Sequence, residues 1–190
     1  MTPEDGEALV ESLLREMAAM TPPVRVVAKE GLWHQRGIDR FLRAVTLGGQ
    51  GRYLTDYVTT LGRTILVPSG WGSVPAHRRY EVLRHELVHV RQFERWGWLG
   101  MVLIYGLLPL PAGLAWGRAR LEWEAYAETL RVTAELEGID AARDPKLHAE
   151  IVRRFTGPDY AWMWPFPGMV QGWIDAEVAA LSKESTKATR

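Results

Sequence analysis

Five consecutive residues carry the strongest signal for chemistry: His85-Glu86-Leu87-Val88-His89, the pattern HExxH. Residues four positions apart lie on one face of an α-helix, so both imidazoles can point at a single metal ion. A carboxylate beside the first histidine lies close enough to take a proton from a water molecule that zinc has activated. The pattern therefore predicts zinc ligands at His85 and His89, with Glu86 as the catalytic base of a hydrolase.

The sequence around the motif favours the helix that this chemistry needs. Neither Gly nor Pro occurs between Ala76 and Trp96, and Gly97 fits the left-handed position that commonly follows a helix. In a chain of this composition, chance produces roughly 0.01 occurrences of HExxH. The alternative interpretation, a histidine pair on a solvated helix face, is therefore the weaker one.

A catalytic zinc site uses three protein ligands and one water, so the motif needs a third ligand. The chain contains no cysteine, which leaves His, Asp and Glu. A histidine six residues after His89 would mark the metzincin pattern, but that position is Arg95, and His148 lies in a polar helix start. Glu122, in a later predicted helix, is the preferred third ligand, and Glu124 offers a rival register on that helix.

The combination of HExxH with the segment EWEAY at 122–126 resembles the gluzincins. This superfamily includes thermolysin and the CAAX prenyl proteases, and its single-domain minigluzincin proteins are closest in size. The resemblance extends from the predicted strand region at 59–67 through the helix that carries Glu122. At Tyr126 the family has an aspartate that orients a ligand histidine, so this contact is weaker here or is made by another residue.

The resemblance implies a ligand set of His85, His89 and Glu122, with Glu86 as the base. It also implies an edge strand near 59–67 that holds an extended peptide, a natural mode of binding beside an exposed sheet edge. The function that follows is that of a zinc-dependent peptidase acting on peptide or protein substrates.

Several residues near the C-terminal half are open to more than one interpretation. Tyr126 and Tyr160 are both candidates for stabilising an oxyanion, and the sequence does not choose between them. Asp159 is a more distant alternative to Glu122 as metal ligand, as in the aspzincins. The aromatic segment at 162–166 either walls a substrate cleft or belongs to the core, and we favour the core.

The function has two alternatives to a peptidase. One is a non-catalytic or self-inhibited zinc-bearing module that binds a partner or a membrane surface through the apolar stretch at 98–117. The other is a hydrolase of a different bond, because zinc chemistry does not depend on which carbonyl is attacked. The intact Glu86 favours catalysis, since a pure binding site needs no base beside its ligand.

The remaining sequence predicts an α+β fold. Thr2 and Pro3 mark the start of an N-terminal helix. Segments rich in β-branched and aromatic residues predict a small sheet of three or four strands, at 24–28, 41–47 and 53–67. In the last of these, Gly62 could turn a hairpin or form a bulge. Helices follow, at about 74–96, 118–137, 145–157 and 169–181, and the residues after 181 are expected to fray.

We expect one metallopeptidase-like domain over the full 190 residues. Its sheet part spans 24–68, and its metal-binding helices, one with HExxH and one with the ligand glutamate, span 74–137. The C-terminal helical part spans 138–190.

The stretch at 98–117 carries no charge and is as long as a membrane span. However, His89 and Glu122 lie on either side of it and must meet at one ion, which a single crossing would prevent. Pro109 and Pro111 also interrupt any continuous helix. Three interpretations remain open: a buried helical hairpin, a contact between copies of the chain, and a loop that dips into a membrane surface.

Charge and composition limit the classes of binding partner that we expect. Lys and Arg number 23, equal to Asp and Glu, so no net field attracts nucleic acid. The N-terminal residues are acidic, unlike the basic start of a secretory signal. We therefore expect a cytoplasmic protein without a nucleic-acid partner, associated with a membrane if the apolar stretch contacts one.

Overall fold

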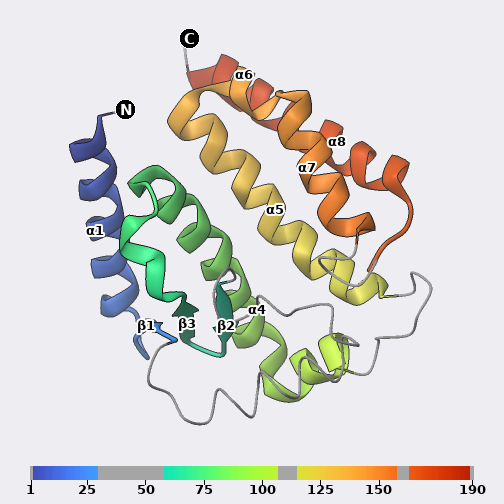
Figure 1. The fold of residues 1–190 in the computed structure, drawn as a ribbon. Helices are drawn as coiled ribbons and strands as arrows, with labels where there is room; N and C mark the ends of the chain where they lie inside the picture. The colour runs from blue at the N-terminus through green and yellow to red at the C-terminus, as the bar shows by residue number, and fades with distance from the viewer. Residues whose placement is uncertain (1, 30–57, 107–114, 158–162, 189–190) are drawn as a thin grey trace. The chain divides into compact units, whose positions relative to one another are not determined.

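The structure, a computed structural model, describes residues 2–29, 58–106, 115–157 and 163–188. The chain divides into two compact units, Met1–Met101 and Val102–Arg190. The first unit combines helices with a small sheet, and the second is helical in its described residues (Figure 1). The α+β class expected from the sequence is confirmed, whereas the single domain stays a prediction.

Helix α1 (Pro3–Ala19) begins where the sequence predicts, with Thr2 as its N-cap. The Thr2 hydroxyl accepts a hydrogen bond from the Asp5 backbone N–H at 3.2 Å, and the Asp5 carboxylate accepts one from the Thr2 N–H at 3.0 Å. Backbone donors in the first turn have no partner within the helix, and this reciprocal pair satisfies two of them. The hydrogen bond from the Thr2 side chain also lowers the pKa of Asp5 below its ordinary value.

In the described residues the sheet has three strands: β1 (Arg25–Ala28), β2 (Thr59–Leu61) and β3 (Thr64–Val67). β3 lies in the centre, parallel to β1 and antiparallel to β2. Gly62, with a φ of 60°, turns the hairpin between β2 and β3, which confirms the hairpin and not the bulge. The predicted strand at 41–47 and the start of the one at 53–67 lie outside the described residues.

The HExxH motif lies on α4 (Ala76–Gly106), which follows the short 3-10 helix η1 (Ser69–Ser73). The backbone of α4 is non-helical at Gly97, with φ 66° and ψ 174°, so two helical segments meet there at a kink. The first segment ends where the sequence predicts. The second begins at Trp98, whose ring packs against Phe93 with 5.1 Å between centroids.

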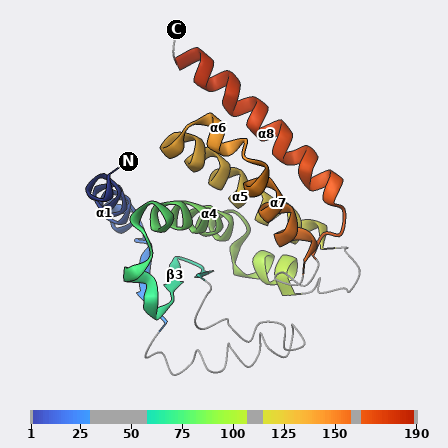
Figure 2. The same cartoon turned by 45° about the horizontal axis from the view of Figure 1, so that its top comes forward.

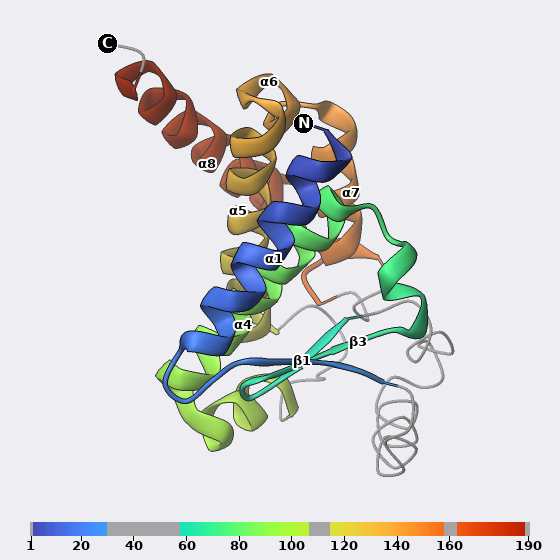
Figure 3. The same cartoon turned by 90° about the vertical axis from the view of Figure 1, so that its left-hand side faces the viewer.

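Figure 3 shows α1, the sheet and α4 of the first unit, and one hydrophobic core joins these elements. Helix α4 contributes Leu83, Leu87 and Val90, whose spacing places them on one helical face. They belong to the same buried cluster as apolar residues of α1 and β3, namely Val10, Leu13, Met17, Ile65 and Val67. Burial of this face fixes the rotation of α4 about its axis and so determines where the motif residues point.

The second unit contains α5 (Trp116–Glu137), α6 (Ile139–Ala142), α7 (Pro145–Thr156) and α8 (Pro167–Ala188). Gly138, with a φ of 92°, ends α5 as predicted. Asp144 caps α7, also as predicted, by accepting a hydrogen bond from the Lys146 N–H at 2.9 Å. Helix α8 packs against α5, α6 and α7 (Figure 2) and is longer than the expected helix at 169–181.

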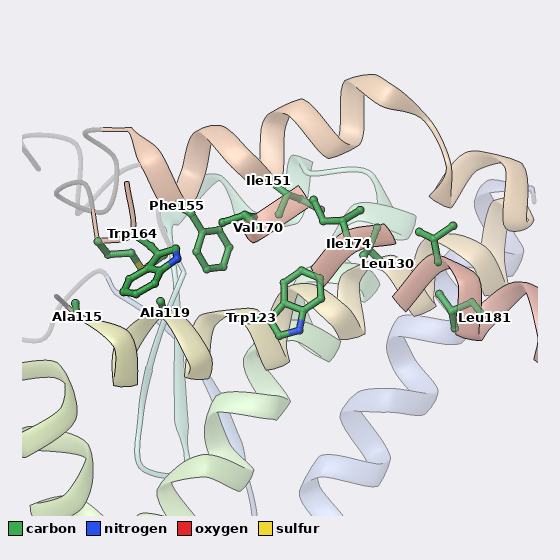
Figure 4. Close-up of a cluster of buried hydrophobic side chains, with 12 residues drawn as sticks. Ala115, Ala119, Trp123, Leu130, Ile151, Phe155, Trp164, Val170, Ile174 and Leu181 are labelled. Atoms are coloured by element: carbon green, nitrogen blue, oxygen red, sulfur yellow. The ribbon is translucent and has the colours of Figure 1, made fainter. Parts of the chain in front are cut away.

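A separate hydrophobic core holds the helices of the second unit together (Figure 4). Phe155 of α7 is fully buried, in a cluster that includes Leu130 of α5 and Ile174 of α8. Met163 and Trp164 belong to the same cluster. These two members of the aromatic segment at 162–166 are therefore core residues, as we favoured.

The apolar stretch at 98–117 lies partly within the described residues. The side chains of Trp98, Leu99 and Leu103 are 59%, 73% and 44% exposed, while Met101 between them is buried. The interpretation of the stretch as a buried helical hairpin is therefore wrong for these three residues. Among the described helices, none is both long and apolar enough to cross a membrane.

Candidate metal centre

Both histidines of the motif lie on the first segment of α4. His85 and His89 are one turn apart, and their ring centroids are 5.2 Å apart at an interplanar angle of 73°. His89 is buried and His85 is half-buried. Two imidazoles this close on one helical face can serve a single metal ion.

The glutamate of the motif is held by the sheet. Glu86 is buried, and its Oε2 accepts a hydrogen bond of 2.7 Å from the hydroxyl of Thr60 on β2. The same hydroxyl lies 3.5 Å from the backbone carbonyl oxygen of Glu86. This hydrogen bond compensates for part of the cost of burying a polar carboxyl group.

The second histidine has a partner on its own helix. Nδ1 of His89 lies 2.9 Å from Oε1 of Gln92, whose side chain is completely buried. An amide oxygen only accepts, so Nδ1 carries the proton and donates. In a neutral ring of this tautomer, Nε2 carries the lone pair that can bind a cation. Gln92 thus makes the kind of contact that the aspartate expected at position 126 would make to a ligand histidine.

Glu122 is buried on α5, with 4% of its surface exposed. With His85 and His89 it forms a group in which each residue offers one ligand atom, and these atoms all lie within 4.8 Å of one another. Within the described part of the chain, no other set of three or more His, Asp or Glu meets this condition. Glu124, the rival candidate, is half-buried and does not belong to the group.

The chemistry of this donor set fits zinc. Two imidazole nitrogens and one carboxylate oxygen are a known ligand combination of catalytic zinc sites, which keep a fourth position for water. His85, His89 and Glu122 are therefore a group that could hold a zinc ion.

Other candidates from the sequence lie elsewhere. The ring of Tyr126 packs against Phe155, with 5.5 Å between centroids, at the core of the second unit. His148 is engaged in local structure, because its Nε2 donates to the last carbonyl of α6 at 2.8 Å. Asp159 and Tyr160 lie outside the described residues.

Two residues of the site are missed by sequence reasoning. The contact of Gln92 could have been predicted, because a residue three positions after His89 lies about one helical turn away and can reach the imidazole ring. No sequence signal identifies Thr60, because its contact with Glu86 depends on how β2 pairs with β3 and packs.

No known protein family, curated protein or solved structure matches the chain. The resemblance to gluzincins therefore depends on the motif residues and their spacing.

Proposed function

We propose that the protein is a zinc-dependent hydrolase in which His85, His89 and Glu122 bind the metal ion and Glu86 is the catalytic base. The observation that carries the proposal is the buried Glu86 carboxylate, which follows a ligand histidine in sequence and is hydrogen-bonded by Thr60. Burying a carboxylate costs free energy. A site that only bound metal would gain nothing from this cost.

Each residue has a defined role in this proposal. A zinc ion held here would lower the pKa of a water molecule to about 7 and polarise the carbonyl of a substrate. Glu86 accepts a proton from the attacking water and passes it to the leaving amine. Gln92 keeps His89 in the tautomer whose Nε2 can bind a cation.

Peptide and protein chains are the proposed substrates, in keeping with the resemblance to gluzincins. Among the described strands, β2 is at the edge of the sheet, and its Thr60 contacts Glu86. A peptide that adds as a further strand beside β2 would therefore lie close to the base.

A second role is favoured by the exposed side chains of Trp98, Leu99 and Leu103. Clustered apolar side chains on a surface commonly mark a contact with a partner or a membrane. We propose that the stretch at 98–117 binds a membrane surface or a second copy of the chain. We further propose that the protein is cytoplasmic and has no nucleic-acid partner, and that it is membrane-associated if this stretch binds lipid.

Metal analysis of the purified full chain, together with an assay on a mixed peptide library, tests the proposal. We expect one zinc ion per chain and loss of this zinc in His89→Ala. His148→Ala is the matched control and should retain the metal. Stoichiometric zinc in His89→Ala would contradict the assigned site.

Glu86→Gln separates metal binding from catalysis. The amide cannot accept a proton, so we expect this variant to keep the zinc and lose hydrolysis. Hydrolysis at the wild-type rate in this variant would show that Glu86 is not the base.

A further inference from the structure

We infer that Thr60 is a positioning residue, whose hydroxyl holds the carboxylate of Glu86 in the orientation that proton transfer requires. This inference depends on the proposed hydrolase function, in which Glu86 is the base. Thr60 itself takes no part in proton transfer.

The register of the sheet explains why Thr60 reaches the motif. Thr60 pairs with Ile65 of β3, and residues directly opposite each other in a sheet share one face. Ile65 is fully buried in the core that α4 shares through Leu83 and Leu87. The side chain of Thr60 therefore lies on the face that packs against α4, next to Glu86.

The neighbouring threonine does not share this environment. Successive side chains of a strand point to opposite faces, so Thr59 lies on the other side of β2. Its hydroxyl accepts a hydrogen bond of 3.3 Å from Nζ of Lys29. Thr59 thus has the same chemistry on the same strand without contact to the motif, and it provides a matched control.

The hydrogen bond matters because a base must be well oriented. A glutamate side chain has three rotatable bonds, and burial alone does not choose one orientation of its carboxylate. The bond of 2.7 Å from Thr60 engages one carboxylate oxygen and so restricts its rotation. A displacement of about 1 Å in a catalytic group can lower a rate by about a hundredfold.

Kinetics of three variants test this role. Thr60→Val keeps the shape of the side chain and removes the donor, so kcat should fall by about tenfold to a hundredfold. KM should change by less than about threefold, and zinc should stay at one per chain, because neither the substrate contacts nor the ligands change. Thr60→Ser restores the hydroxyl and should recover kcat to within about threefold of the wild type. Thr59→Val changes the same strand without contact to Glu86, so it should lower kcat far less than Thr60→Val does.

Two kinetic outcomes would overturn the inference. One is a kcat in Thr60→Val within about twofold of the wild type. The other is an equal loss in Thr60→Ser, which would indicate that packing matters and the hydroxyl does not.

A second measurement does not depend on activity. Unfolding by urea is compared for four zinc-free proteins: the wild type, Thr60→Val, Glu86→Ala and the double variant. Thr60→Val should raise the equilibrium constant for unfolding by about tenfold or more when Glu86 is present. When residue 86 is alanine, the same substitution should change this constant by less than about twofold. Equal effects in both backgrounds would show that the two side chains are not coupled. Failure of the hydrolase proposal looks different, because the wild type itself would then cleave nothing.

Discussion

Nδ1 of His89 donates a hydrogen bond to Oε1 of Gln92 over 2.9 Å, at a fully buried position one turn further along α4. The contact fixes the plane of the imidazole and its tautomer together. A metal ligand that is already oriented loses less conformational freedom when it binds, so Gln92 should contribute to affinity without touching the ion.

Gln92→Leu should therefore weaken zinc binding by about tenfold to a hundredfold. Leucine fills a similar volume but leaves the Nδ1–H of His89 without this acceptor. Gln92→Glu keeps an acceptor in place and should bind zinc more tightly than the leucine variant. Affinity is measured by competition with a chromophoric chelator at fixed pH. Equal zinc affinities of Gln92→Leu and the wild type would show that this contact does not orient the ligand.

The two glutamates of α5 give a second comparison. Glu122 is buried and belongs to the group with the histidines, whereas Glu124 is half-buried and does not. Glu122→Ala should weaken zinc binding far more than Glu124→Ala, because it removes one of the three proposed protein ligands. The same competition assay measures both. The reverse order would show that the register is wrong, and equal small effects would point to Asp159 or to a site with two protein ligands.

The boundaries of α4, α5 and α7 were predictable because their signals are local. Asp144 caps α7 through a hydrogen bond to a residue two positions away. Gly97 and Gly138 adopt positive φ angles, which glycine tolerates better than other residues. Each signal acts within one turn of its helix, so a single sequence contains all the information needed.

The end of α8 was predicted wrongly. Polar residues after 181 suggested fraying, but the helix continues to Ala188. The Ser182 hydroxyl donates to the Val178 carbonyl at 2.6 Å, and the Thr186 hydroxyl donates to the Ser182 carbonyl at 2.9 Å. These hydroxyls are satisfied inside the helix, so they do not compete with it by forming turns.

The contact between Thr60 and Glu86 could not be predicted from the sequence. The spacing of HExxH placed both histidines on one face, because that relation depends only on helical geometry. The bond from Thr60 to Glu86 joins residues 26 apart in sequence, and it requires a particular strand register. Register depends on which face of the strand is buried, which a three-residue strand such as β2 hardly specifies.

The core of the second unit allows a prediction about stability. Phe155 is completely buried, whereas Phe166 is about half exposed. Phe155→Ala should lower the free energy of unfolding by about 3–5 kcal/mol, because it removes a buried ring and leaves a cavity. Phe166→Ala is the control and should cost clearly less. Denaturation with urea measures both, and similar losses would contradict the assignment of Phe155 to the core.

The exposed apolar side chains after the kink at Gly97 lead to the last prediction. Trp98, Leu99 and Leu103 are each more than one third exposed in a segment without charge. Side chains of this kind insert into the boundary between lipid headgroups and acyl chains, and tryptophan favours that boundary. The protein should therefore sediment with liposomes. Replacing all three residues by glutamine should reduce the bound fraction several-fold, because each loses apolar area.

Leu14 of α1, which is 37% exposed, supplies the control, and Leu14→Gln should leave liposome binding unchanged. Analytical ultracentrifugation without lipid distinguishes the other proposed role of this surface. If the wild type forms a dimer that the triple variant loses, and liposome binding is absent, the surface joins two copies of the chain. A wild-type protein that is monomeric and does not bind liposomes would contradict both proposed roles. In that case neither lipid nor a second copy of the chain would cover these side chains.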